Sequence, residues 1–285
     1  MNINDALNDA ERAFRQRGIP APRLDAEVLL SHTLAADRGF LYRHGGREMT
    51  EDEAEAFAAL AARRCAHEPV AYILGSKEFW SLSFEVDDRV LIPRPETEVV
   101  VEEVLRIAGE AGKSGIDILD AGAGSGAIGI ALAAELPRAA ITALDISFPA
   151  LLTARRNART HGVEGRMCFI CGNLCEPLGG KFDIVVSNPP YIADKDYEAL
   201  PEDVRKYEPR PALVAGPEGT EIHAALIRRG DSALKRGGWL VLEMGAGQER
   251  DIEGMFAASG LFGGSRCRKD YAGIPRVIMA QRKEA

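Results

Sequence analysis

The feature that most constrains the fold is a repeated alternation of apolar runs and amphipathic segments between residues 115 and 281. GIDILDAG, AAITALDIS, RMCFICGN, KFDIVVSN and GWLVLEMG resemble buried strands, and apolar residues recur at helical spacing after all but the third. Such alternation builds a mostly parallel sheet with helices on both faces. SRCRKDYAGIPRVIMAQRK adds two strands with no helix between them, which makes one strand antiparallel. We therefore predict an α/β fold with a seven-stranded, mostly parallel, Rossmann-like sheet.

The beginning of the chain has a different pattern. Three segments with apolar residues three and four apart predict a small helical domain over residues 1–75. Thr50 and Glu53 have the spacing of a capping box at the start of the third helix. The length of 285 residues accommodates a second, larger domain.

A hairpin is predicted between the two domains. Residues 76–93 contain EFWSLSFEV and RVLIP, separated by Asp87-Asp88, which is typical of two short strands and their turn. The next helix is expected to begin at Pro95 and to end at Gly112. Residues 94–285 would then form the domain that holds the sheet.

Charge and hydropathy limit the possible partners. The formal net charge is −8, which argues against a partner bound mainly through phosphates, because such binding depends on clusters of Lys and Arg. No apolar run approaches the ~20 residues of a membrane-spanning helix. The start, MNINDALNDAERAF, is acidic and amphipathic, unlike a signal peptide. We expect a cytoplasmic protein without direct nucleic-acid or membrane binding, and we expect it to act as a monomer.

The cysteines are odd in number, which fits reduced thiols better than a disulfide framework. Cys168, Cys171 and Cys175 are spaced closely enough to suggest a metal site. However, Cys168 and Cys171 fall in a predicted strand, where residues three apart point to opposite faces. We therefore interpret them as buried structural thiols and expect no metal; the two remaining cysteines are Cys65 and Cys267.

A glycine-rich loop follows the first strand of the predicted sheet. Asp120-Ala121-Gly122-Ala123-Gly124-Ser125-Gly126 leads into a helix, where glycines let the backbone turn sharply and approach a ligand. Asp145 ends the next strand, about 20 residues later, where a carboxylate can accept hydrogen bonds from ribose hydroxyls. These features predict a nucleotide-type cofactor site. Gly122, Gly124 and Ala127 also satisfy the dinucleotide pattern, so an NAD-dependent dehydrogenase remains an alternative.

Asn188, Pro189, Pro190 and Tyr191 follow the strand KFDIVVSN, at the same sheet edge as the glycine loop. Asn-Pro alone is also a common turn dipeptide. Two successive prolines are stiffer than a turn requires, and neither carries an N–H. The Asn188 side-chain oxygen and a backbone carbonyl thus offer two acceptors for a planar NH2 group, and Tyr191 offers a flat face. This clamp favours alkylation of an amide or amino nitrogen by a cofactor held in the loop.

These motifs in this order resemble those of S-adenosylmethionine-dependent amino-group methyltransferases. Further segments resemble the release-factor glutamine methyltransferases of the HemK or PrmC type: VAYILG (70–75), EF (78–79), LIPRPETE (91–98), EPR (208–210) and KDYAG (269–273). The resemblance extends over nearly the whole chain. It implies N5 methylation of the glutamine in the Gly-Gly-Gln motif of class-1 peptide chain release factors, with S-adenosylhomocysteine as the second product.

The resemblance also implies roles for individual residues. Gly122, Ala123, Gly124, Ser125 and Gly126 would surround the methionine part of the cofactor, and Asp145 would hold its ribose. Asn188 and the Pro189 carbonyl would hold the substrate amide beside the cofactor, in a slot shaped by Pro190 and Tyr191. The helical domain would dock the release factor.

One position departs from the family pattern. Asn173, followed by Leu174, stands where the family usually has an acid for the adenine amino group. An amide oxygen still accepts that hydrogen bond, but without charge assistance, so we expect weaker cofactor binding. A nucleic-acid methyltransferase acting on adenine N6 would use the same clamp and is the main alternative; a non-enzymatic cofactor-binding module is another.

Overall fold

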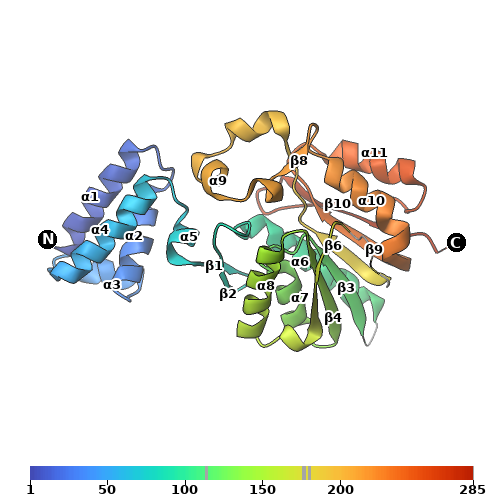
Figure 1. The fold of residues 1–285 in the computed structure, drawn as a ribbon, viewed down its shortest axis with the longest axis horizontal. Coiled ribbons are helices and arrows are strands. Elements are labelled where there is room, and N and C mark those ends of the chain that lie inside the picture. Colours follow the sequence, from blue (N-terminus) through green and yellow to red (C-terminus); the bar gives the residue numbers. More distant parts are fainter. Residues whose placement is uncertain (113–114, 175–177, 179–180, 285) are drawn as a thin grey trace. The chain divides into compact units, whose positions relative to one another are not determined.

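A computed structural model describes residues 1–112, 115–174, 178 and 181–284. The chain divides into two compact units, each with its own core (Figure 1). The first unit comprises Met1–Ser76 together with Pro201–Tyr207, and the second comprises Lys77–Leu200 and Glu208–Ala285. Within the described residues, no helix is both long and apolar enough to cross a membrane.

The first unit is helical. Its helices are α1 (Ile3–Gln16), α2 (Pro22–Thr33), α3 (Arg38–Arg43), α4 (Glu51–Cys65), α5 (Val70–Leu74) and α9 (Glu202–Tyr207). Phe14, Leu29 and Leu30 are fully buried in its core. The capping box predicted at Thr50 and Glu53 is confirmed at the start of α4.

Helix α9 belongs to the first unit although it is distant in sequence. The guanidinium of Arg64, 5% exposed, lies 2.8 Å from Asp25 and 3.7 Å from Asp203. The Tyr207 hydroxyl donates to the Ala66 carbonyl at 2.8 Å. These contacts are made by side chains far apart in the chain, which is why sequence periodicity did not assign α9 to this unit.

The hairpin consists of β1 (Ser76–Phe79) and β2 (Leu82–Glu85). Its turn is at Trp80 and Ser81, whose φ angles are 53° and 56°, as a two-residue hairpin turn requires. The prediction that Asp87-Asp88 forms the hairpin turn was therefore wrong. A turn does occur there, with the Val90 N–H donating to the Asp87 carbonyl at 3.1 Å, but RVLIP is not a strand. Contacts distant in sequence hold the unusual turn residues, because Trp80 donates its backbone N–H to Glu98 and its indole N–H to Glu135.

The main sheet of the second unit has seven strands in the order β10-β11-β9-β6-β3-β4-β5. Its strands are β3 (Ile116–Ala121), β4 (Ala139–Asp145), β5 (Met167–Cys171), β6 (Phe182–Ser187), β9 (Leu234–Glu243), β10 (Arg266–Lys269) and β11 (Pro275–Gln281). Strand β11 is antiparallel to both of its neighbours, and the pairs among β5, β4, β3, β6 and β9 are parallel. The predicted α/β fold is confirmed. A short parallel pair, β7 (Ile192–Ala193) and β8 (Val214–Gly216), was not predicted.

Helices cover both faces of this sheet (Figure 1). The helices are α6 (Glu98–Ala111), α7 (Ala127–Glu135), α8 (Phe148–Thr160), α10 (Glu221–Ala233) and α11 (Glu249–Ser259), with short 3-10 turns η1 (Pro95–Thr97), η2 (Glu164–Arg166), η3 (Asp194–Ala199) and η4 (Arg210–Ala212). Leu240 and Leu242 of β9 share a core cluster with residues of α10 and α11. Since strand side chains alternate between faces, Val241 and Glu243 point to the opposite face.

The helix predicted from Pro95 to Gly112 is confirmed. The turn η1 begins at Pro95 and leads directly into α6. The helix ends at Gly112, whose φ of 59° is in the left-handed region that glycine adopts easily.

The expectation of buried cysteines was wrong. Cys168 and Cys171 are exposed, and Cys65 and Cys267 are partly exposed. The reason is topological, because β5 is an edge strand of the sheet and its pattern did not reveal that position. Cys175 lies outside the described residues.

Candidate active site

A cavity of about 360 Å³ opens where the sheet changes its direction of winding. From β3 the chain proceeds to β4 and β5 on one side, and β6 then returns to the other side of β3. Ligands bind in such sheets at the carboxyl ends of the strands beside this reversal. Gly122, Asp145 and Asn188 follow or end β3, β4 and β6 and line the cavity together.

The glycine loop is held against the end of β4. The N–H groups of Gly122 and Ala123 donate to the Leu144 carbonyl at 2.8 and 3.0 Å. Gly122 and Gly124 line the cavity with φ angles of 80° and 55°. A side chain at either position would strain the backbone, so the loop presents main chain to the cavity.

The other residues of the loop have different surroundings. Ala123, Ser125 and Gly126 are not among the cavity-lining residues. A Cβ on Gly126 would lie 2.9 Å from the Ile130 side chain and 3.1 Å from the Ala154 Cβ. Gly126 therefore permits close packing of α7 against α8. The Ser125 carbonyl accepts a hydrogen bond from Asn157 at 2.9 Å.

Asp145 is fixed by backbone hydrogen bonds at the rim of the cavity. Its Oδ2 accepts from the Gly124 N–H and its Oδ1 from the Ser147 N–H, both at 2.8 Å. Burial raises the pKa of Asp145, and these backbone donors oppose the rise. Each carboxylate oxygen has a further lone pair, so Asp145 can accept hydrogen bonds from a ligand without moving.

The cavity wall next to Asp145 is apolar with a polar edge. Leu144, Ile146 and Leu174 supply apolar surface, and Asn173 supplies an amide. Ile146 is 67% exposed, so its side chain is accessible to a ligand. The two carboxylate oxygens of Asp145 can accept hydrogen bonds from ribose hydroxyls, and the apolar wall with an amide at its edge suits a base. The residues present therefore suit S-adenosylmethionine.

The proline segment forms the opposite wall. Asn188 and Pro190 line the cavity, and Pro189 between them is buried. Tyr191 is not a lining residue; its pKa is raised to about 12, mainly by burial. The Tyr191 carbonyl accepts a hydrogen bond from Gln248 at 3.0 Å, and Gln248 also donates to the Gly219 carbonyl at 3.0 Å. This anchors the segment that follows the two prolines.

Two further segments complete the cavity and were not predicted as site residues. Glu208, 4% exposed, accepts from the Ile92 N–H at 3.2 Å and pairs with Arg94. Around this carboxylate, residues 89–91 and 209–214 contribute the lining residues Arg89, Val90, Leu91, Pro209, Pro211, Ala212 and Val214. The available signal was the pair of motifs LIPRPETE and EPR, but nothing local shows that they meet.

Two carboxyl groups are buried under the site. Asp120 at the end of β3 accepts from the Gly129 N–H at 2.9 Å, and its other oxygen has no partner among the described residues. Glu243 at the end of β9 accepts from the Thr97 hydroxyl at 2.6 Å. Burial raises the pKa of each to about 7. No group of three or more His, Cys, Asp or Glu side chains within the described ranges could hold a metal ion.

Comparisons with known families and proteins show what this chain is similar to. Residues 5–75 match the PrmC N-terminal domain, and residues 102–203 match the methyltransferase small domain. The release factor glutamine methyltransferase of Geobacter sulfurreducens is 43% identical over 277 residues, covering 97% of this chain and 95% of that protein. The release factor glutamine methyltransferase of Moorella thermoacetica is 40% identical over the full length of both chains.

Solved structures with lower sequence identity share the fold. A methyltransferase from Pyrococcus furiosus has a TM-score of 0.54 at 18% identity, covering 79% of this chain and 99% of that one. The catalytic domain of hMettl16 in complex with an RNA hairpin has a TM-score of 0.59 at 16% identity, covering 79% of this chain and 82% of that one. At these identities the likeness concerns the fold alone.

Proposed function

The chain belongs to the release factor glutamine methyltransferase family, and we propose the following assignment of roles in that reaction. The enzyme transfers a methyl group from S-adenosylmethionine to the side-chain amide nitrogen, N5, of the glutamine in the Gly-Gly-Gln motif of class-1 peptide chain release factors. The second product is S-adenosylhomocysteine. The observation that carries this proposal is that Gly122, Asp145 and Asn188 line one cavity.

The cofactor occupies the side of the cavity next to β3 and β4. Asp145 would accept hydrogen bonds from the ribose hydroxyls, and the lining residues Ile146, Leu174 and Asn173 would surround the adenine. The backbone at Gly122 and Gly124 accommodates the methionine part, with Ala123, Ser125 and Gly126 completing the loop. When bound, the cofactor supplies an electrophilic methyl group, and no metal is needed.

The substrate amide is held by the proline segment. Asn188 Oδ1 and the Pro189 carbonyl accept the two hydrogens of the glutamine NH2, while Pro190 and Tyr191 shape the slot. Accepting both hydrogens fixes the nitrogen in place and stabilises the positive charge that it gains during alkylation. Preorganised groups of this kind commonly contribute ~10² to ~10³ in rate. The proton that the nitrogen loses afterwards leaves with solvent.

The proposed domain roles follow the family assignment. Residues 1–75 match the PrmC N-terminal domain and are proposed to dock the release factor. Residues 76–93 link this domain to the catalytic domain, residues 94–285. We propose a monomer in the cytoplasm, where peptide chain release factors act, with no direct contact to nucleic acid, in accordance with the net charge of −8.

Mass spectrometry of a release factor incubated with the protein and S-adenosylmethionine tests this function. We expect a gain of one methyl group on the Gly-Gly-Gln glutamine. A release factor with glutamate in place of that glutamine should gain none, because it lacks the NH2 group. Methylation of an adenine-containing RNA or DNA in a parallel assay, with an unmodified release factor, would contradict the proposal in favour of the adenine N6 alternative.

A further inference from the structure

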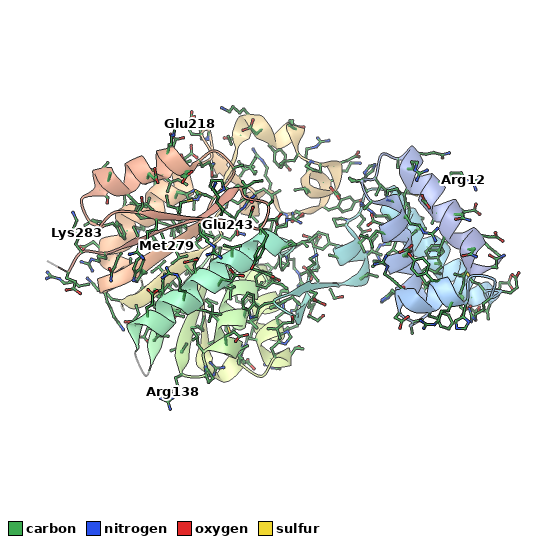
Figure 2. The ribbon with its side chains drawn as sticks, turned by 180° about the vertical axis from the view of Figure 1, so that it is seen from behind. Arg12, Arg138, Glu218, Glu243, Met279 and Lys283 are labelled. Atoms are coloured by element: carbon green, nitrogen blue, oxygen red, sulfur yellow. The ribbon has the colours of Figure 1, made fainter. Side chains whose placement is uncertain are left out.

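Asn188 is connected to a buried carboxylate by a chain of two hydrogen bonds. Its Nδ2 lies 3.1 Å from the Thr97 hydroxyl oxygen, which lies 2.6 Å from Glu243 Oε2. Thr97 is 4% exposed and Glu243 1%. The three residues follow β6, end the turn η1 and end β9, respectively. Figure 2 labels Glu243 near the helix α6 that η1 precedes.

The donor and acceptor properties of the three groups fix the direction of these two hydrogen bonds. When Glu243 is ionised, its carboxylate only accepts hydrogen bonds, so the Thr97 hydroxyl donates its single hydrogen to Glu243. The Thr97 oxygen then has only lone pairs left for Asn188. Of the two ends of the Asn188 amide, only the NH2 group can donate to them. The NH2 end is therefore turned to Thr97, which leaves Oδ1 for the cavity that Asn188 lines.

The orientation matters because the two ends of an asparagine amide have nearly the same shape and opposite hydrogen-bonding character. With Oδ1 toward the substrate, Asn188 accepts from an NH2 group. With Nδ2 toward the substrate, two donors would face each other. Packing alone does not distinguish these arrangements, whereas an acceptor at Thr97 does.

From this geometry we propose that Thr97 and Glu243 are positioning residues, which hold the Asn188 amide with its oxygen toward the substrate nitrogen. The inference rests on the proposed function of Asn188 and extends it. Neither residue touches the substrate amide in this scheme. Their effect on the rate passes through Asn188.

The surroundings of Glu243 have opposing effects on its pKa. Burial raises its pKa to about 7, while the Thr97 hydroxyl and the positive charges of Arg276 and Arg94 lower it and Glu96 opposes them. Its backbone carbonyl is 2.8 Å from His223 Nε2, and burial lowers the pKa of that histidine. Burial raises the pKa of the nearby Tyr191 hydroxyl to about 12, so this hydroxyl is neutral at physiological pH.

Protonation of Glu243 would allow both hydrogen bonds to reverse their direction. The acid could donate to Thr97, and Thr97 could then donate to a reversed Asn188 amide. Ionisation of Glu243 therefore supports the productive orientation. We call the connection from Glu243 through Thr97 to Asn188 the relay. It predicts that kcat falls as the pH decreases through about 7.

A double-mutant cycle tests the relay. Thr97→Val keeps the shape of the side chain and removes the hydroxyl, and we expect kcat to fall by ~10- to ~100-fold, less than a direct loss of a preorganised partner. The KM for the release factor and the Kd for S-adenosylmethionine should each change by less than about threefold, since neither ligand touches Thr97. Thr97→Ser retains the hydroxyl and should recover most of kcat.

The second arm of the cycle isolates the pathway. In an Asn188→Ala background, adding Thr97→Val should change kcat by less than about twofold, because the group that Thr97 orients is gone. An equal loss in both backgrounds, or a Thr97→Val enzyme with wild-type kcat, would overturn the inference. Thr153→Val is the matched control, because Thr153 is fully buried on α8 and is not a cavity-lining residue. It should leave kcat unchanged.

Thr97→Val leaves Glu243 without its hydroxyl partner, so stability must be measured in parallel. If the single variant does not fold, Thr97→Val combined with Glu243→Leu removes both polar partners at little cost and should show the same loss of kcat. The wild-type assay separates the two claims. A wild-type protein that does not methylate the release factor refutes the proposed function, whereas an active wild type with unaffected variants refutes only the relay.

Discussion

The two sides of the cavity are built in different ways. On the side of β3 and β4, the backbone holds the functional group, since N–H groups of Gly124 and Ser147 fix the Asp145 carboxylate. On the side of β6 and β9, side chains hold it, since Thr97 and Glu243 fix the Asn188 amide. In the first arrangement, Gly124 and Ser147 are 21 and 2 positions from Asp145 in the sequence. In the second arrangement, Asn188 and Thr97 are 91 positions apart in the sequence, and Thr97 and Glu243 are 146 positions apart.

The position of the Asn188 amide therefore depends on contacts more distant in sequence than those that place the Asp145 carboxylate. A carboxylate accepts hydrogen bonds equally well at either oxygen, so backbone donors suffice to place it. An amide has two unlike ends and needs a partner that distinguishes them. In the proposed assignment, backbone hydrogen bonds thus place the group that holds the cofactor, and a tertiary network of side chains places the group that holds the substrate.

The largest effect is expected on the substrate side. Asn188→Ala removes one of the two proposed acceptors and should lower kcat by ~10² to ~10³. The Kd for S-adenosylmethionine, measured by calorimetry, should change by less than about fivefold, because Asp145 and the loop remain. A large loss of cofactor affinity with an unchanged kcat at saturation would reverse the assignment of the two sides.

The next effect concerns stability and its dependence on pH. The pKa of Asp120 is raised to about 7 by burial from an ordinary value of 3.8. Between these values the folded protein retains a proton that the unfolded chain has released, so this contribution to stability is lost as the pH rises toward 7. Asp120→Asn has no such proton to lose.

The free energy of unfolding of the wild type, minus that of Asp120→Asn, should therefore decrease by about 2 to 3 kcal/mol between pH 5 and pH 8, since a tenfold change in proton affinity corresponds to ~1.4 kcal/mol. Urea unfolding at several pH values measures it. The other titrating groups are the same in both proteins and cancel. A difference that stays constant with pH would show that Asp120 is ionised throughout.

A smaller effect is expected on cofactor binding. Asp145→Ala removes the acceptors proposed for the ribose and should raise the Kd for S-adenosylmethionine by ~10- to ~100-fold, as expected for hydrogen bonds to a charged group. Asp145→Asn keeps one acceptor oxygen and should lie between this variant and the wild type. If both variants bind like the wild type, the ribose is held elsewhere.

The smallest effect is expected at Asn173. Asn173→Asp gives the adenine amino group a charged acceptor and should tighten S-adenosylmethionine binding by up to ~10-fold, because charge-assisted hydrogen bonds are roughly twice as strong as neutral ones. Cofactor titration measures the change. An unaltered Kd would refute the idea that the amide weakens binding.

Local patterns predicted most of the fold, and they identified Gly122, Gly124 and Asp145, which line the cavity. The strands around the glycine loop, the antiparallel β11 and the capping box at Thr50 all follow from short-range periodicity or spacing. Asp145 could be identified because it ends a strand near the loop in sequence. These features depend on interactions within a few turns or between adjacent strands.

Features that depend on tertiary contacts were missed. The hairpin turn at Trp80 and Ser81 has residues that do not favour positive φ, and contacts to Glu98 and Glu135 hold it. The exposure of Cys168 depends on β5 being an edge strand. Thr97 and Glu243 are far from Asn188 in sequence, so no spacing rule connects them.

A crystal structure of the protein with S-adenosylhomocysteine and a Gly-Gly-Gln peptide would show which groups hold the glutamine amide. We expect the glutamine nitrogen within hydrogen-bond distance, about 2.7 to 3.2 Å, of both Asn188 Oδ1 and the Pro189 carbonyl, with Asn188 Nδ2 still on Thr97. A peptide amide bound away from Pro189, or an Asn188 whose oxygen points to Thr97, would contradict it.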